Sequence, residues 1–390
     1  ADVPVGAFLS VGDDSSTIAA IMQSQSNIPI NTFTIGFKEE IYNEAIYAKA
    51  IANHLKTNHT ELYVTPQQAL DVIPGLPGLY CEPFADSSQI PTFLVSKLAR
   101  EKVTVAVTGD GGDELFSGYN RYTLTKELWC KIFHLPVWAR SFIASSMTSL
   151  SPNSWNIIAN SVPSLVPKSL RLNNLGEKIH KAAKVITTKQ FDDFYLGLVT
   201  HCKPEEIVIG SHEQKPLLNY KQSGFTLFDD VEKMMIIDAM TYLPDDILVK
   251  VDRASMAVSL ESRIPFLDHR VVDFAWRIPQ SMKINKGSSK WILREILYKH
   301  VPKHLINRPK MGFAVPIDTW LRGPLRDWAE NLLDENRLKQ EGFFHPEPIR
   351  NKWLEHLSGK KNWQHFLWNV LMFQSWLNTQ QLPKENFINY

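Results

Sequence analysis

Short apolar runs alternate with helical stretches in the first part of the chain, and this alternation constrains the fold more than any other feature. Strand-like runs occupy 5–9, 32–37, 59–64 and 103–107, with helical stretches between them at 15–22, 43–55 and 90–101. Strands separated by helices in this way pair in parallel. The sequence therefore predicts an α/β fold with a doubly wound, mostly parallel sheet, which binds ligands at the carboxyl ends of its strands.

The sequence pattern changes after Tyr122, where strand signals become weak and long amphipathic stretches rich in Trp follow. Pro and Ser/Asn clusters at 149–154 and 163–169 interrupt them. We expect a large, mostly helical region packed around and beside the sheet. Because a strand-like run begins almost at the first residue, we also expect the chain to be part of a longer protein.

Composition and charge argue against several classes of protein. The 42 basic and 41 acidic side chains give a formal net charge of +1, which provides no global field for binding nucleic acid or an anionic membrane. Cys81, Cys130 and Cys202 have neither the even number of a disulfide framework nor metal-ligand spacing. We find no apolar run long enough for a transmembrane helix and no signal-peptide pattern. These features predict a cytoplasmic protein.

The turn after the first strand, Ser10 to Ser16, has the composition of an anion-binding loop. Small residues let the backbone approach an anion, and the N–H groups that start the next helix point towards it. Ser15 and Ser16 can cap that helix or donate to phosphate oxygens, and Asp14 can hold a magnesium ion that bridges the phosphates. An ordinary helix cap in a tight turn explains the same residues, so this turn alone leaves both interpretations open.

A second turn, Thr108 to Glu114, follows the fourth strand and contains only Gly and acidic residues after its threonine. Glycine permits close approach of a ligand, and carboxylates at the end of a buried strand are costly unless they bind cations or have partners. A solvated acidic loop is the alternative. Because both turns lie at the same edge of the predicted sheet, together they predict a magnesium–nucleotide site.

Two further segments place charges at helical spacing. Residues 243–268 mix Asp, Arg and Glu with apolar residues, and for Glu261 and Arg263 we favour a buried ion-pair lattice that positions helices. Lys290 follows a Gly-Ser-Ser loop and is predicted in the first turn of a helix, where the helix dipole disfavours a cation. Its position indicates a phosphate or carboxylate partner, although a surface lysine explains it as well.

Taken in order, several segments resemble the synthetase domain of the glutamine-hydrolysing asparagine synthetases, in the PP-loop ATP pyrophosphatase group. They are 2–10, 82–88, 108–122, 251–256, 261–268, 290–295 and 310–313. The resemblance runs through most of the chain and implies a Rossmann-like fold. Residues 1–122 would form the nucleotide-binding α/β core. Residues 123–390 would form the mostly helical remainder of the same synthetase domain, carrying Lys290.

The resemblance also implies roles for individual residues. Those that match nucleotide contacts are Leu9, Ser10, Gly12, Asp14, Ser15, Ile35, Thr108 and Gly109. Asp14 and Asp113 match magnesium-binding carboxylates. Lys290 matches a lysine that stabilises charge at the α-phosphate, and Asp110 matches an acidic catalytic position that is often Glu. The implied cofactors are ATP and Mg²⁺.

The implied reaction is ATP-dependent asparagine synthesis. The aspartate β-carboxylate attacks the α-phosphorus of ATP, pyrophosphate leaves, and ammonia then displaces AMP, with Asp110 as a candidate general base. We expect the family's glutaminase domain to be missing from this chain, so that free ammonia is the donor here and glutamine in the intact protein. The resemblance is compatible with a homodimer and indicates no nucleic-acid or membrane partner.

Two loop positions depart from the family pattern Ser-Gly-Gly-x-Asp-Ser. Val11 replaces a glycine, and a β-branched residue resists positive φ. Asp13 adds negative charge beside an anion site. We expect retained ATP use with reduced activity. The alternatives are a relative that forms another amide or a lactam by adenylation, and a nucleotide-binding module without catalysis.

Overall fold

A computed structural model describes residues 2–37, 45–161, 175–200, 202–211, 228–307 and 315–381. These residues form two compact units. The first contains described residues within 1–120, 235–316 and 372–390, and the second contains those within 121–234 and 317–371. The predicted domains, 1–122 and 123–390, remain a prediction, because compact packing alone does not show which segments fold independently.

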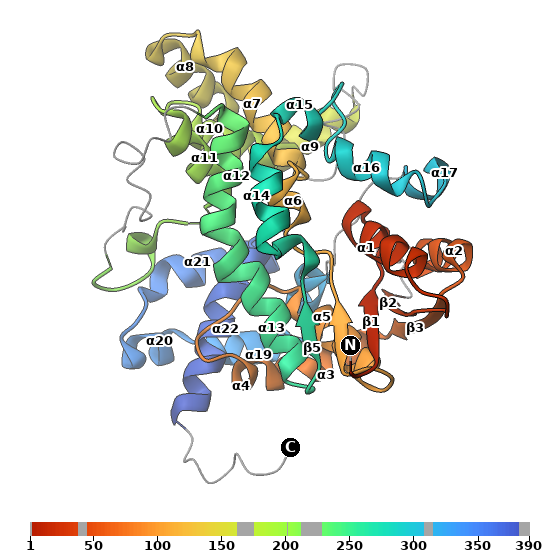
Figure 1. Ribbon diagram of the computed structural model, residues 1–390. Coiled ribbons are helices and arrows are strands. Elements are labelled where there is room, and N and C mark those ends of the chain that lie inside the picture. Colours follow the sequence, from red (N-terminus) through yellow and green to blue (C-terminus); the bar gives the residue numbers. More distant parts are fainter. Residues whose placement is uncertain are drawn as a thin grey trace. The chain divides into compact units, whose positions relative to one another are not determined.

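A parallel sheet lies within the first unit (Figure 1). Its strands are β1 (Val5–Phe8), β2 (Asn31–Phe37), β3 (Asn58–Val64), β4 (Val105–Val107) and β5 (Glu261–Arg263), in the order β3-β2-β1-β4-β5. Every neighbouring pair is parallel, and Ala7 is in register with Thr32 on one side and Val107 on the other. The predicted α/β class and the four predicted strands are confirmed.

Helices cover both faces of this sheet. α1 (Asp13–Ser24) and α2 (Ala45–Leu55) follow β1 and β2, so right-handed crossovers place both on one face, where they pack together (Figure 1). The chain then returns past β1 to β4 through α5 (Gln89–Arg100). The same handedness places α5 on the other face, where it packs against α13 (Val249–Met256). The sheet is therefore doubly wound, as predicted.

Apolar burial fixes the position of α1. Ile18 packs with Ala7 of β1 and Val107 of β4. On another side of the helix, Ala19 packs with Ile51 of α2 and with Leu297. Full burial of one side chain such as Ile18 stabilises the fold by about 1.5–3 kcal/mol. Because α1 is held in this way, its first turn starts directly after the carboxyl end of β1.

The edge strand β5 was not predicted, because Glu261-Ser262-Arg263 contains no apolar residue. Its backbone forms the ladder: Glu261 N–H donates to Thr104 O and Thr108 N–H donates to Arg263 O, both at 2.9 Å. Glu261 and Arg263 do pair, with 2.7 Å between Oε1 and Nε, but their side chains are 56% and 57% exposed. The predicted burial of this pair is therefore wrong, since an edge strand leaves polar side chains in water.

The remaining structure is helical, which confirms the predicted helical region for the described residues. Further helices within the first unit are α3 (Pro66–Val72), α4 (Leu76–Leu79), α6 (Gly112–Leu115), α14 (His269–Arg277), α15 (Gln280–Lys283), α16 (Trp291–Leu297) and α17 (Lys303–Ile306), with a π-helical turn at Leu243–Leu248. Helices of the second unit, some of which continue into the first, are α7 (Asn120–Phe133), α8 (Val137–Thr148), α9 (Pro152–Ser161), α10 (Leu175–Val185), α11 (Phe191–Val199), α12 (Asp230–Met240), α18 (Ile317–Arg322), α19 (Arg326–Leu332), α20 (Glu335–Glu341), α21 (Pro346–Leu357) and α22 (Gln364–Gln381).

Among the described helices, none combines the length and apolar character needed to cross a membrane. The three cysteines are free thiols. The segments 163–169 and 310–313, singled out in the sequence, lie outside the described residues.

Candidate functional site

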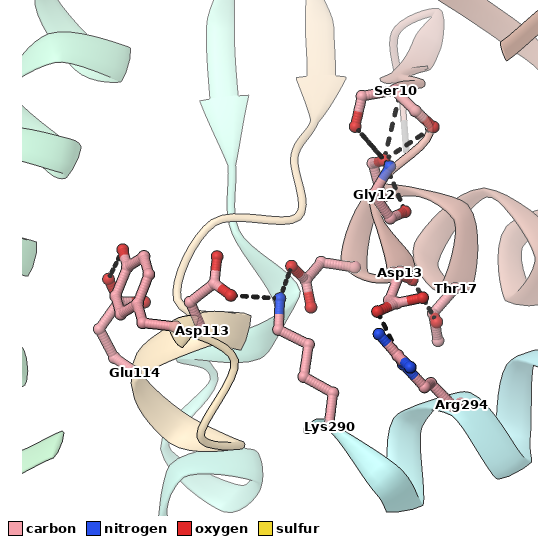
Figure 2. Close-up of polar contacts among 11 residues, drawn as sticks. Ser10, Gly12, Asp13, Thr17, Asp113, Glu114, Lys290 and Arg294 are labelled. Atoms are coloured by element: carbon pink, nitrogen blue, oxygen red, sulfur yellow. Dashed lines mark hydrogen bonds and ion pairs between the residues drawn. The ribbon is translucent and has the colours of Figure 1, made fainter. Parts of the chain in front are cut away.

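The turn between β1 and α1 is closed by its own serines (Figure 2). The hydroxyl oxygens of Ser10 and Ser15 lie 2.7 Å apart, and Ser10 N–H donates to Ser15 Oγ at 3.1 Å. Gly12 N–H donates to Ser10 Oγ at 3.2 Å, and Gly12 is the N-cap of α1. Small residues, hydroxyls and a helix start thus meet at the end of a central strand, which is a favourable place for an anion.

Val11 and Asp13 lie in this loop without the strain or the uncompensated charge expected from the sequence. Described non-glycine residues with positive φ are Lys56, Ser117, Ser259, Lys286 and Lys290. Val11 therefore does not adopt the conformation that a β-branched residue resists. Asp13 Oδ2 accepts a hydrogen bond from Arg294 Nε at 3.0 Å, so a cation offsets its charge (Figure 2).

The turn after β4 touches the start of α1 because its glycines lack side chains. A Cβ on Gly109 would lie 2.6 Å from Ser15 N and 2.9 Å from the carbonyl carbon of Asp14. A Cβ on Gly112 would collide with the Asp14 carboxylate. The two turns singled out in the sequence are therefore in contact, and the contact requires glycine at these positions.

Lys290 joins the two turns (Figure 2). Its side chain is 4% exposed, and its Nζ pairs with Asp14 and lies 2.6 Å from Asp113 Oδ1. Burial alone would lower the pKa of Lys290, but the charges of Asp14 and Asp113 outweigh it and raise the pKa. Lys290 is the N-cap of α16 with φ 53°, not a residue of its first turn as predicted. Its partners are carboxylates, which is one of the two chemistries that the sequence indicated.

A pocket of about 230 Å³ lies at the carboxyl ends of β1 and β4. Predicted site residues that line it are Leu9, Ser10, Gly12, Asp14, Ser15, Thr108, Gly109, Asp110 and Asp113. Ile35 does not line it but is buried in β2, and Lys290 reaches it through its two carboxylate partners. The other candidate residues therefore gather around one pocket.

Two acidic groups of this pocket have raised pKa values. Burial raises the pKa of Asp110, and the nearby Thr108 side chain together with the charge of Lys250 only partly offsets that effect. Burial also raises the pKa of Glu114 to about 7, although Tyr119 Oη donates to Glu114 Oε1 at 2.6 Å. Raised carboxyl pKa values in a pocket are typical of groups that exchange protons near neutral pH.

The sequence interpretation missed a second charged group at the pocket. Lys250 of α13 lines the wall, and its Nζ lies 2.6 Å from Asp86 Oδ2. Asp246, in the π-helical turn, feels the charges of both Lys250 and Asp86. Its pKa is raised to about 7, mainly by burial and secondly by the negative charge of Asp86. One signal was present: Lys250 is the single charge within the apolar segment 247–251.

Asp246→Asn should stabilise the protein increasingly as pH rises. The folded protein keeps a proton on Asp246 that the unfolded chain releases near its ordinary pKa, so the free energy of unfolding falls as pH rises from about 4 to about 7. Asn imitates the neutral form throughout. Between pH 5 and 8 the stabilising effect should grow by on the order of 1–3 kcal/mol in denaturant titrations. Asp245→Asn, at an exposed neighbour, is the control, and an effect independent of pH would contradict the assignment.

Comparison with known proteins agrees with this architecture. A family model described as asparagine synthase matches residues 1–378. The chain is 30% identical to the glutamine-hydrolyzing asparagine synthetase 1 of Bacillus subtilis, over 98% of this chain and 58% of that protein. It is 33% identical to a putative glutamine-hydrolyzing asparagine synthetase of Mycobacterium bovis, over 96% of this chain and 54% of that protein. A protein of Penicillium rubens named Amidase chyE is 24% identical, over 88% of this chain and 54% of its own length.

These matches cover nearly all of this chain but only part of each relative. The chain spans about half the length of the curated relatives it matches, and the similarity falls on their C-terminal part. The family match, by contrast, covers nearly the whole chain. The chain belongs to the asparagine synthase family, whose members are generally ATP-dependent ligases.

Proposed function

We propose that this chain activates the β-carboxylate of aspartate as an adenylate and transfers ammonia to it, giving asparagine, AMP and pyrophosphate. One observation carries the proposal: two turns that are distant in the sequence line one pocket beside the start of α1, and a buried lysine pairs with an aspartate from each turn. Membership of the asparagine synthase family supports it.

ATP would bind with its phosphates against the turn between β1 and α1. Backbone N–H groups at the start of α1 and the hydroxyls of Ser10 and Ser15 are suited to phosphate oxygens. Thr108 and Gly109 would contact the nucleotide from the turn after β4. Leu9 would form part of its apolar wall. Ile35, which the resemblance also assigns to the nucleotide pocket, is buried in β2 and does not line it.

The residues present fit a magnesium ion bound together with phosphate. Within the described part of the chain, no group of three His, Cys, Asp or Glu residues could hold a metal by itself. Asp14 and Asp113, however, converge on one cation, the Lys290 ammonium. Magnesium is commonly held by one or two carboxylates plus substrate phosphates. We therefore propose that Asp14 and Asp113 hold Mg²⁺, which would neutralise phosphate charge.

Lys290 would stabilise negative charge at the reacting phosphate. Its raised pKa keeps it protonated at neutral pH. Two of its three N–H donors face Asp14 and Asp113, which fix the ammonium in place and leave the third for a phosphate oxygen. A charge fixed in a buried site needs no reorganisation when the β-carboxylate attacks and pyrophosphate leaves.

Asp110 would handle the proton of the second half-reaction. Ammonia forms the C–N bond by attacking the acyl carbon, the bond from that carbon to the AMP oxygen breaks, and one proton must leave the nitrogen. Burial raises the pKa of Asp110 and so makes its ionised carboxylate a stronger base. The donor for this chain would be free ammonia. In a longer protein of the relatives' length, glutamine would supply it.

Incubation with ATP, Mg²⁺, aspartate and ammonium tests the proposal. Pyrophosphate, AMP and asparagine should appear in equal amounts and only when aspartate is present. Folded protein that forms no pyrophosphate under these conditions would refute it. A nucleotide-binding module without catalysis would instead gain thermal stability from magnesium–ATP and form no product.

A second candidate is adenylation of a different carboxylate. The similarity to the Penicillium rubens protein named Amidase chyE supports this alternative, because a related sequence carries the name of a different activity. The same incubation decides between the two candidates. AMP formation with another carboxylic acid, and no asparagine with aspartate, would favour the alternative.

Val11→Gly should leave the KM for ATP within about twofold of its original value. Val11 adopts no positive φ and does not line the pocket, so its side chain has no strain or phosphate contact to relieve. Glycine should lower the free energy of unfolding by about 0.4–1 kcal/mol, because it gives the unfolded chain more conformations. A severalfold decrease in the KM for ATP would mean that the valine does crowd the phosphates.

A further inference from the structure

Lys250 is a buried cation on the pocket wall that the proposed chemistry does not use. Lys250 is 8% exposed and lies on α13. The nearby residues Ile247 and Val251 also line the pocket. Removing an ammonium from water is costly, and an ion pair recovers the cost only with good geometry and further hydrogen bonds. A lysine retained at an otherwise apolar part of the wall therefore calls for a partner.

Asp86 satisfies only part of that need. Asp86 Oδ2 accepts from Lys250 Nζ at 2.6 Å and from Ser88 Oγ at 2.7 Å, and Asp86 Oδ1 accepts from Ser88 N–H at 2.9 Å. Asp86 is thus held rigidly by its own loop. An ammonium has three N–H donors, and in the described residues Asp86 accepts the one hydrogen bond from Lys250. Two N–H donors remain for a ligand in the pocket.

Lys250 lines the same pocket as Asp110, the proposed base of the second half-reaction. The positive charge of Lys250 and the negative charge of Asp113 both act on Asp110. Asp113, the carboxylate proposed to hold Mg²⁺, lines this pocket too. The phosphates already have Lys290, the start of α1 and the serine hydroxyls, so the second lysine is available to the other substrate.

We infer that Lys250 binds the α-carboxylate of the amino-acid acceptor and so selects an acceptor that carries a second carboxylate. This inference rests on the proposed function. The β-carboxylate of aspartate becomes part of the adenylate, which leaves the α-carboxylate as the remaining anionic group of the acceptor. Its two oxygens match the two N–H donors of Lys250, and such charge-assisted bonds are about twice as strong as neutral ones. Asp86 and Ser88 act as positioning residues for Lys250.

β-Alanine provides the direct test, because it is aspartate without the α-carboxylate. The rate of ATP-dependent pyrophosphate formation is measured with aspartate and with β-alanine, and the ratio of the two kcat/KM values is compared between proteins. Lys250→Met should lower this ratio by about 10- to 100-fold and raise the KM for aspartate, with the KM for ATP unchanged. Lys250→Arg, which keeps the charge, should restore part of the ratio.

Lys250→Met alone leaves the Asp86 carboxylate without its cation and could unfold the protein. The double variant Asp86→Asn/Lys250→Met removes both charges and keeps an acceptor for Ser88, so the ratio stays measurable. Lys283→Met is the matched control. Lys283 is 1% exposed, and its Nζ lies over the Trp276 ring, 5.0 Å from the ring centroid. It is not among the residues that line the pocket. This control should leave the ratio unchanged.

The outcomes separate the inference from the proposed function. The inference is supported if the ratio falls in Lys250→Met and in Asp86→Asn/Lys250→Met, and does not fall in Lys283→Met. An unchanged ratio in a variant that still uses aspartate overturns the inference and leaves the proposed function intact. Unmodified protein that forms no pyrophosphate with aspartate overturns the proposed function, and the inference falls with it.

Discussion

Lys290→Met should lower aspartate-dependent pyrophosphate formation by about 10²–10³-fold. The ammonium is fixed by Asp14 and Asp113 beside the pocket, and loss of one such preorganised charge typically has an effect of this size. Steady-state rates at saturating ATP and aspartate measure it. Near-normal turnover by folded Lys290→Met protein would remove the lysine from the proposed mechanism.

The same substitution should also destabilise the protein when no metal or nucleotide is present. Asp14 and Asp113 have side chains only 12% and 15% exposed, and without Lys290 they would repel each other. Removing one partner of a buried ion pair typically costs about 3–5 kcal/mol. Added Mg²⁺ should recover part of this stability if the two carboxylates bind the ion. Lys339→Met, in an exposed pair with Glu335, is the control and should change stability by less than about 0.5 kcal/mol.

Gly109→Ala should cause the second large loss, through sterics rather than charge. The added Cβ would lie 2.6 Å from Ser15 N and 2.9 Å from the carbonyl carbon of Asp14, and backbone atoms in a packed helix start cannot yield. The turn after β4 must then move away from α1. Overpacking of this kind costs about 1–3 kcal/mol, and a displacement of about 1 Å at a reacting site can lower the rate by about 10²-fold.

Gly78→Ala is the matched control for that prediction. Gly78 lies in α4, and a Cβ there would meet no atom within 4 Å. The change should leave turnover intact and alter stability by no more than about 1 kcal/mol in the stabilising direction. Wild-type kinetics for Gly109→Ala would mean that the two turns need not touch for activity.

The central strands could be predicted from the sequence because parallel strands buried on both faces are continuous apolar runs. Val5–Phe8 and Val105–Val107 illustrate this. β5 could not be predicted in the same way. Glu261–Arg263 forms at the sheet edge through backbone hydrogen bonds to the β4 segment, and a polar tripeptide carries no local signal for such pairing.

The candidate site also contains some residues that the sequence shows locally and others that only the fold brings together. Both turns were visible because each is a continuous segment after a strand. Lys290 was visible because a cation is unexpected at the predicted start of a helix, and its catalytic role is implied by the family resemblance. The partners Arg294 for Asp13 and Asp86 for Lys250 are separated by 281 and 164 residues along the chain. Only folding brings such side chains together, so a reader of the sequence sees isolated charges.

Aspartate labelled with ¹⁸O in its β-carboxylate tests the central claim most directly. The enzyme is incubated with ATP, Mg²⁺ and ammonium, and the products are analysed by mass spectrometry. If the β-carboxylate attacks the α-phosphorus, AMP gains one ¹⁸O atom, asparagine keeps one, and pyrophosphate gains none. Unlabelled AMP, or ¹⁸O in inorganic phosphate, would contradict adenylation at this pocket.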